Sequence, residues 1–531
     1  MIKADNWAKE AYRQGLRQDY TLTVSGAQNR MTYYSSLSYL NNQGIIEKSD
    51  YKRLAARLKA DYQAKDWLKI GANMSYTKFE SNSLSNNGSE GSTGNIWAYT
   101  SQIAPIYPLY IRNANGSQYV DGNGIAVLDH GNGNIGLGGI PGTSRPFITD
   151  ANPLLALRYN TNNDEGNALS TQGYIDAEII KGLVLTVNAS ANLDESRTNY
   201  VYNPYYGQFR TTEGTVSMYH TRSYAWNTQQ LLNYTHDFDL HTLEVMLGHE
   251  YYSRKYYLLG ADKNHMFSQD NKELDGAVVD GQGATSYQTH YNNEGYFSRI
   301  QYDYADRYFV SGSFRRDASS KFLPENRWGS FWSASAAWIM SKEPWYNVNW
   351  LNELKFKASI GSQGNDDISS YLYTDIFDIV PSDGAVSTLF SRKGNPDITW
   401  ETNTNINAGI EFGMFNDRIT GGIEVYDRKT TDMLFPTPVP PSQGYSSIWK
   451  NVGDMDNWGV EGDFNFGLVR SRNVQWDLNL NVSYLKNTVT YLADNVKDSK
   501  VYDAAGNEYE GFTSGNFFVA EGASMYTWYT Y

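Results

Sequence analysis

The feature that most restricts the fold of this chain is an alternation of apolar and polar side chains with a period of two residues. In residues 183–194 the odd positions from Leu183 to Leu193 are all apolar, whereas five of the six even positions are polar. Successive side chains of a β-strand point to opposite faces, so this period predicts a strand with one apolar face. By the same reasoning we expect sixteen strands, at 18–25, 31–41, 51–62, 67–78, 171–180, 183–194, 224–238, 241–253, 294–304, 308–317, 328–340, 353–361, 398–412, 418–431, 458–467 and 474–486.

The connections between these segments alternate in length. Tight turns such as "KG", "DL" and "ADR" alternate with long links at 79–170, 195–223, 254–293 and 432–457. Outer-membrane barrels have short turns at one rim and long extracellular loops at the other. The expected strands also exceed the usual five or six residues, and none contains proline. The sequence therefore predicts an all-β fold, a transmembrane antiparallel β-barrel with long extracellular loops.

One segment also fits a helix. The stretch "YKRLAARLKADYQA" is rich in helix-forming residues and places Leu54 and Leu58 four positions apart. Read as a strand, it separates Leu54, Ala56 and Leu58 from charged neighbours. Because only a short turn leads to the clear strand at 67–78, we predict a strand here.

The composition excludes several classes of protein. With 44 basic and 58 acidic residues the net charge is -14, and no basic stripe suits the phosphates of a nucleic acid. The absence of cysteine excludes disulfides, thiolate metal sites and a cysteine nucleophile. No apolar run reaches the length of about 18 residues that a membrane-spanning helix needs, and the first residues lack the pattern of a signal peptide.

The segment "RWGSFWSASAAW" carries tryptophans at both ends of an expected strand. Trp328 and Trp338 share one face and are ten positions apart, which corresponds to roughly 33 Å along a strand. With the usual tilt this span matches the height of an apolar band of about 25 Å between two aromatic girdles. We therefore expect Trp328 and Trp338 to face lipid at the two membrane interfaces, with Ser333 and Ser335 on the opposite face; Trp332, inside the band, has no explanation.

No motif carries catalytic chemistry, so we do not expect an enzyme or a resident cofactor. A GxGxxG pattern at Gly131, Gly133 and Gly136 is followed by "LGGIPGTSRPF", which cannot open a nucleotide-binding helix. The histidines lack the spacing of metal ligands. The acidic segment 262–276 leaves a loop-bound Ca²⁺ as an option without the spacing of an EF-hand.

Aromatic residues in the long loops are candidates for substrate binding, because they stack on sugar rings and on peptide side chains. They are Trp97, Tyr99, Tyr107, Tyr110, Tyr205 and Tyr206. The alternative is that they form a small core that packs the loops themselves.

Several stretches resemble one family. The segments "YADRYFVSGSFRRDASSKF", "RWGSFWSASAAWIMSKEPW", "GNPDITWETNTNINAGIEF" and "VYDRKTTDMLFPTPVPPSQGYSSIWKNVGDMDNWGVEGDFNF" are similar to SusC/RagA-type TonB-dependent transporters of the Bacteroidota outer membrane. The resemblance spans nearly the whole chain. Where the family has Phe-Pro-Ser after Arg-Trp-Gly, this chain has Phe331, Trp332 and Ser333, which bears only on local strand geometry.

The resemblance implies a 22-stranded barrel around a plug, energy from TonB, ExbB and ExbD, and a SusD-like lipoprotein over the extracellular loops. It divides the chain into a plug-to-barrel connection, residues 1–17, and a partial barrel domain, residues 18–531. Because the plug and the last strands of the family are not found, we expect a barrel fragment that would not close a ring by itself.

The resemblance implies uptake of oligosaccharides or peptides across the outer membrane of a Gram-negative cell. A passive porin is the first alternative, since it would share the barrel without the plug. A secreted all-β protein that binds glycans is the second. Neither the transported substrate nor the ligand-contact residues follow from the sequence.

Overall fold

Most of the chain forms one antiparallel β-sheet. The computed structural model describes residues 5–83, 96–113, 115–122, 124, 126–129, 131, 145, 152–205, 211–268, 270–382, 384–497, 499–502 and 506–528. These residues fall into two compact units. The first comprises residues 1–174, 189–226 and 254–290, and the second comprises residues 175–188, 227–253 and 291–531.

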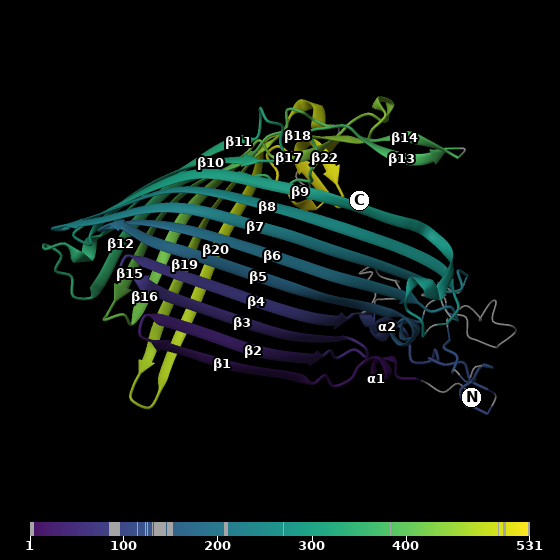
Figure 1. Ribbon diagram of the computed structural model, residues 1–531. Coiled ribbons are helices and arrows are strands. Elements are labelled where there is room, and N and C mark those ends of the chain that lie inside the picture. Colours follow the sequence, from purple (N-terminus) through teal and green to yellow (C-terminus); the bar gives the residue numbers. More distant parts are fainter. Residues whose placement is uncertain are drawn as a thin grey trace. The chain divides into compact units, whose positions relative to one another are not determined.

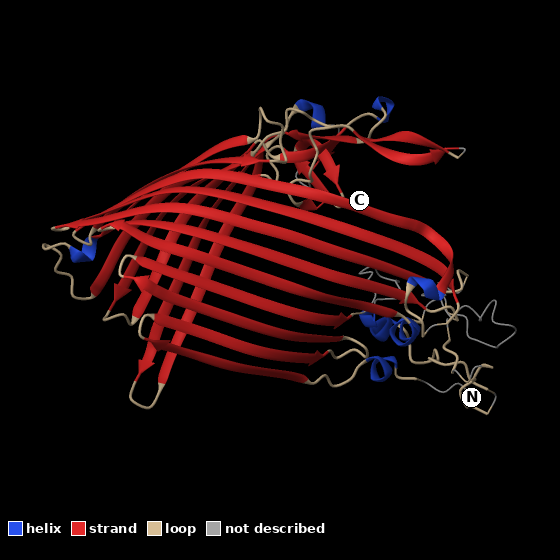
Figure 2. Cartoon of the chain, viewed as in Figure 1, coloured by secondary structure: helices blue, strands red, loops and turns tan. Residues whose placement is uncertain are grey.

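The large sheet has sixteen strands (Figures 1 and 2), and each of the sixteen expected segments overlaps one of them. Every strand pairs with its neighbour in the order β1 to β12, β15, β16, β19 and β20. Their bounds are β1 Arg17–Gln28, β2 Met31–Gln43, β3 Asp50–Lys65, β4 Leu68–Asn82, β5 Thr161–Ile180, β6 Leu183–Tyr202, β7 Thr215–Phe238, β8 His241–Met266, β9 Ala277–Tyr304, β10 Tyr308–Ser319, β11 Trp328–Ile339, β12 Leu351–Asn365, β15 Glu401–Met414, β16 Ile419–Thr431, β19 Asp454–Arg470 and β20 Gln475–Tyr491.

The segment that also fits a helix is a strand. β3 pairs antiparallel with β2 on one side and with β4 on the other over nearly its whole length. Two ladders of backbone hydrogen bonds outweigh a preference for helix that amounts to a few tenths of a kcal/mol per residue. The prediction of a strand at 51–62 is confirmed.

The expected strands are too short at the ends that lead into long links. β5 begins at Thr161 rather than at 171, and β9 begins at Ala277 rather than at 294. These extensions contain sequences such as "TNNDEGNALS", in which polar residues occupy both faces, so the apolar alternation is absent. Trp400 is a further correction: it precedes β15 and is 9% exposed. It packs edge-on against Phe331 instead of sharing the apolar face of Ile406.

Short elements that the sequence analysis did not predict lie in the long connections. They are the helices α1 Trp7–Ala11, α2 Ile96–Gln102 and α3 Pro153–Tyr159, the 3-10 turns η1 Leu274–Gly276, η2 Met340–Lys342, η3 Pro441–Gln443 and η4 Asp494–Val496, and the strands β13 Ile376–Ser382, β14 Ala385–Arg392, β17 Leu434–Pro438, β18 Ser447–Asn451, β21 Ser499–Tyr502, β22 Glu508–Ser514, β23 Phe517–Ala520 and β24 Thr527–Trp528. No helix among the described residues has the length and apolar character needed to span a membrane.

The connections have buried cores of their own. In the first unit, Trp7 and Ala11 of α1 pack with Leu109, Ile111, Val127 and Leu128. In the second unit, Phe322 is fully buried and contacts Trp400, next to Phe331, Ile368, Leu372 and Ile398. Residues of a polar face that lie beside a long connection are thus buried by that connection.

We predict that Phe322→Ala destabilises the protein strongly, by about 3–5 kcal/mol, because it empties a buried aromatic site. The measurement is denaturant unfolding in detergent micelles. The matched control is Phe267→Ala, since Phe267 is 91% exposed and its truncation should change stability by less than about 0.5 kcal/mol. Equal effects of the two substitutions would contradict a loop core around Phe322.

Candidate functional site: the polar face of the large sheet

The two faces of the large sheet differ sharply in chemistry. Where β10 and β11 pair, the hydroxyl groups of Ser311 and Ser335 are 2.7 Å apart, and those of Ser313 and Ser333 are 2.6 Å apart. The opposite face of the same strands carries exposed apolar side chains, namely Tyr308, Val310, Phe314, Trp328 and Trp332. One apolar and one polar face is the pattern of a strand between lipid and an aqueous interior.

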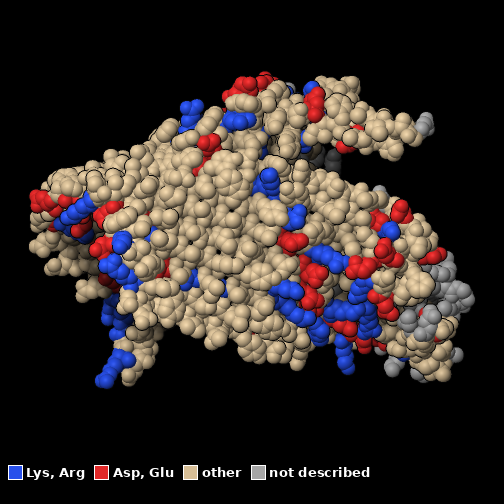
Figure 3. All heavy atoms as spheres, viewed as in Figure 1, with Lys and Arg blue, Asp and Glu red and all other residues tan. Residues whose placement is uncertain are grey.

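The apolar character extends over a wide surface. Figure 3 shows a broad area without acidic or basic side chains, whereas Lys, Arg, Asp and Glu gather toward the ends of the strands. Exposed large apolar side chains on β1, β2 and β3 include Leu22, Leu37 and Leu58. A surface of this size on a soluble protein would promote association, so a lipid environment explains it better.

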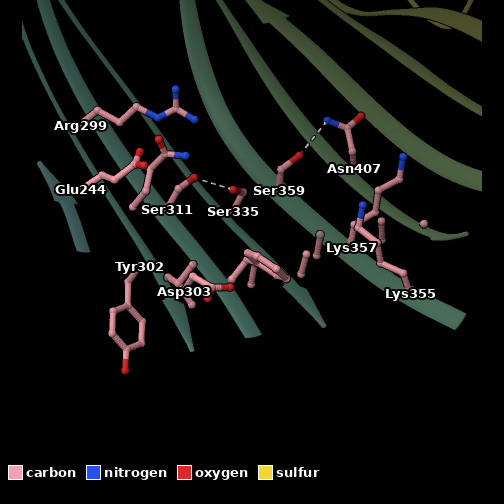
Figure 4. A pocket seen from close by; sticks show the side chains of 18 of the residues that line it. Glu244, Arg299, Tyr302, Asp303, Ser311, Ser335, Lys355, Lys357, Ser359 and Asn407 are labelled. Atoms are coloured by element: carbon pink, nitrogen blue, oxygen red, sulfur yellow. Dashed lines mark hydrogen bonds between the residues drawn. The ribbon is translucent and has the colours of Figure 1, made fainter. Parts of the chain in front are cut away.

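A hollow of about 550 Å³ lies on the polar face in the second unit. Strands β8 to β12, β15 and β16 contribute charged, hydroxyl or amide side chains to its wall, and most of these side chains are labelled in Figure 4. The side chains labelled there include Glu244 of β8, Arg299 and Asp303 of β9, Ser311 of β10, Ser335 of β11, Lys355, Lys357 and Ser359 of β12, and Asn407 of β15. The hollow has hydrogen-bond donors and acceptors, and charged groups of both signs. This lining suits a polar solute or a polypeptide surface.

An ion-pair network continues the polar wall across three strands. Lys355 and Lys357 of β12 both reach Glu411 of β15, at 2.9 and 3.1 Å, and Lys357 also reaches Glu424 of β16 at 2.8 Å. The side chains of these residues are 30–38% exposed, so each pair adds little stability. Their main effect is to hold fixed charges on the wall.

A second network lies nearer the long connections. The guanidinium of Arg315 binds Asp317 at 2.8 Å and Glu250 at 3.1 Å, and it lies 4.8 Å from the centre of the Phe297 ring. The other oxygen of Glu250 accepts hydrogen bonds from Asn227 and Gln229. This network fixes the polar face where the strands meet the loops.

The candidate loop aromatics are spread over different environments. Trp97 is 63% exposed and its ring lies 5.2 Å from that of Tyr12. Tyr107 and Tyr110 pack against the core around Leu109 and Leu128; the carbonyl of Tyr107 accepts a hydrogen bond from the Trp7 indole, and the hydroxyl of Tyr110 accepts one from Arg158. For these two tyrosines the structure favours packing of the loops.

The other three candidates lie elsewhere or are not described. Tyr205 follows β6, and its backbone N–H donates to the side chain of Asn203. The side chain of Tyr99 in α2 and the whole of Tyr206 lie outside the described residues, as do Gly133 and Gly136 of the GxGxxG pattern. A substrate-binding role of Trp97, Tyr99, Tyr205 and Tyr206 stays a prediction.

The two tryptophans of the expected girdle lie on the apolar face at opposite ends of β11. The ring of Trp328 stacks on Tyr296 at 6.3 Å. The ring of Trp338 stacks on Tyr308 and Phe356, and its indole N–H donates to the carboxylate of Glu343 at 3.0 Å. The role of Trp328 and Trp338 at the two lipid interfaces stays a prediction.

Sequence reasoning missed the residues that line the polar wall and the partners that hold Trp338. The alternation with apolar residues places Lys355, Lys357 and Glu411 on the polar face of their strands. The ion pairs between them depend on the register of β12 and β15, which the sequence does not give. Glu343 lies in a turn without any motif. It is nearly buried, and its carboxylate also accepts from Tyr308 and pairs with Arg307 at 3.0 Å.

The described residues contain no group of three or more His, Asp and Glu side chains suited to a metal ion. In the acidic segment 262–276, Glu273 pairs with Arg197 at 2.7 Å. A calcium ion in that loop therefore stays an untested option.

The chain is similar to known outer-membrane receptors. The sequence model described as "TonB dependent receptor-like, beta-barrel" matches residues 107–531. TonB-dependent receptor SusC of Bacteroides thetaiotaomicron is 26% identical over 522 residues, which are 95% of this chain and 50% of that protein. TonB-dependent receptor P3 of Formosa agariphila is 24% identical over 552 residues, covering 98% of this chain and 51% of that receptor.

Solved structures share the fold. The RagAB peptide importer in its closed-closed state superimposes with a TM-score of 0.81 at 22% identity, covering 98% of this chain and 55% of that chain. The ferric citrate transporter FecA gives a TM-score of 0.53 at 7% identity, covering 91% of this chain and 58% of FecA. The chain spans about half the length of the curated relatives that it matches.

We predict that Glu343→Gln lowers the stability of the protein at neutral pH and makes that stability less sensitive to a fall in pH. Hydrogen bonds from Tyr308 and Trp338, and the charge of Arg307, hold the pKa of the Glu343 carboxyl below its usual value. The stabilisation is therefore complete above the ordinary carboxyl pKa of about 4.3 and is lost as the pH falls through the lower value in the folded protein.

The measurement is the thermal midpoint in detergent between neutral and strongly acidic pH. Glu325→Gln serves as the control, because Glu325 is exposed on a connection. Parallel pH curves for Glu343→Gln and the unchanged protein would show that the carboxylate does not anchor Trp338.

Proposed function

This chain belongs to the family of TonB-dependent receptor-like β-barrels, and from that premise we propose that it forms the barrel wall of an active outer-membrane importer. The family consists of outer-membrane receptors and transporters rather than enzymes. The proposed cargo is an oligosaccharide or a peptide. The observation that supports import most directly is the charged polar wall of the large sheet, placed opposite an apolar face.

In this proposal the polar wall of the large sheet guides the cargo and neither makes nor breaks a covalent bond. Charges held by Lys355, Lys357 and Glu411 offer both signs to a passing solute or to a plug segment. Because each charge is partly exposed and already paired, contacts with the wall would exchange readily. Weak, exchangeable contacts suit a path through which cargo has to move.

Two partners belong to the proposal. A SusD-like surface lipoprotein would cover the long connections and capture the cargo, and TonB with ExbB and ExbD would act on a plug inside the barrel. The support is similarity: SusC and P3 are named TonB-dependent receptors, and RagAB is described as a peptide importer. The division into residues 1–17, as connection to a plug, and 18–531, as barrel, is part of the same proposal.

Uptake by cells that produce the natural protein tests import. Cells with and without the gene are given fluorescently labelled oligosaccharide and peptide pools, before and after a protonophore collapses the proton-motive force that powers TonB. We expect uptake of one pool to require both the gene and the proton-motive force. Uptake that survives the protonophore would indicate a passive porin, and fractionation of the protein into the detergent-free soluble fraction would rule out both.

We predict that Lys357→Glu reduces this uptake several-fold while the protein still reaches the outer membrane. The reversed charge would lie beside Glu411 and Glu424, so the wall would repel anions and lose its central cation. Lys342→Glu is the control, since Lys342 is exposed in the turn η2. Equal uptake by both variants would contradict a role of the wall in transport.

A further inference from the structure

A groove with a cation at its side lies on the apolar face of the large sheet. It has a volume of about 650 Å³ and lies in the second unit between β8, β9, β10 and β11. Its lining includes the side chains of Leu247, Tyr296, Ser298, Phe314, Arg316 and Trp328. Four of these are large and 39–53% exposed, so the groove is open along an apolar wall.

Arg316 is unusual on this face. Its side chain is exposed, and within the described part of the chain no hydrogen bond or ion pair holds its guanidinium. Its guanidinium lies over the ring of Trp328, whose centre is 5.3 Å away. By contrast, the neighbouring Arg315 on the polar face binds two carboxylates.

The strand register explains how the aromatic rings frame this cation. Arg316 lies directly opposite Tyr296 of β9, and Trp328 of β11 lies opposite Ala318, two residues further along β10. The rings of Tyr296 and Trp328 stack at 6.3 Å. Stacked aromatic rings hold a guanidinium in place without neutralising its charge.

A carboxylate that lies close to Arg316 in the strand register, on the same face, is already engaged. Glu294 lies opposite Ala318, and one of its oxygens accepts from Tyr296 at 2.8 Å and contacts His249 at 3.2 Å. Glu294 is therefore held toward β8, and the charge of Arg316 is left for an external anion.

The position along the strand indicates the depth of this anion. Arg316 is three residues before the end of β10 at Ser319, on the side of the connection 320–327, which corresponds to roughly 10 Å below the end of the strand. Aromatic residues mark the interface between hydrocarbon and head groups. An anion at Arg316 would thus lie at the head-group level, while the groove beside it faces the acyl chains.

We propose that this groove binds a phosphorylated membrane lipid, with the phosphate on Arg316 and an acyl chain along Leu247, Tyr296 and Phe314. Complementary charge supports this occupant, because guanidinium groups bind phosphate oxygens well. The groove is also continuous with the apolar face, so a lipid reaches it without leaving the bilayer. Lipid A, which carries phosphate groups in the outer leaflet, is the specific form proposed.

The test uses the full-length protein purified from outer membranes and exchanged into nanodiscs of phosphatidylcholine with or without added lipid A. Native mass spectrometry then counts retained lipid A. We expect the unchanged protein to retain it and Arg316→Gln to bind about tenfold more weakly, the equivalent of roughly 1.4 kcal/mol. Arg316→Lys should recover part of the binding because it keeps the positive charge.

Two further variants separate the site from general effects. Ser298→Trp fills the groove and should lower retention while Arg316 is intact. Arg428→Gln removes an exposed arginine that bonds Asn405 on the polar face, and it should leave retention unchanged. Retention by Arg316→Gln equal to that of the unchanged protein, or equal loss in Arg428→Gln, would overturn the proposal. Lipid retention is measured without cargo, so its failure is distinct from a failure of import.

Discussion

The backbone hydrogen-bond ladder is the constraint on which the rest of this structure depends. A strand in hydrocarbon has no water to satisfy its N–H and C=O groups, so each strand requires a partner on both sides. The fourteen strands between β1 and β20 meet this demand by pairing on both sides, and β1 and β20 are the edges of the sheet, each with one partner among the described residues. Regular pairing then forces successive side chains onto opposite faces, and the difference between the faces follows from it.

The same constraint explains where charge is found. On the polar face, Lys355, Lys357, Glu411 and Glu424 form a connected set, and Arg315 is neutralised by Glu250 and Asp317. On the apolar face a charge without a partner is costly. Arg316 lies three residues before the end of β10 and beside the ring of Trp328, which fits the position proposed for it at the level of the lipid head groups.

The long connections are held together by buried apolar side chains, unlike the strands, which are held by backbone hydrogen bonds. Each forms a small core, with Trp7, Leu109 and Leu128 in one unit and Phe322, Ile398 and Trp400 in the other. These cores use aromatic residues that would also suit carbohydrate or peptide binding, so an aromatic residue in a loop is ambiguous until its contacts are known. Tyr107 and Tyr110 are examples, because both pack inward, whereas Trp97 is exposed.

Local sequence by itself determined the sixteen strands and their two faces, because period-two patterning and turn spacing are properties of consecutive residues, and the family was indicated by the resemblance of several segments to known transporters. It was sufficient even for β3, where helix propensity argued otherwise. Only the tertiary structure decided the added length of β5 and β9, the burial of Trp400, the carboxylate of Glu343 beneath Trp338, and the isolation of Arg316 beside its groove. These features depend on the register between strands and on contacts with loops from distant parts of the chain. A local pattern of consecutive residues does not predict such long-range contacts.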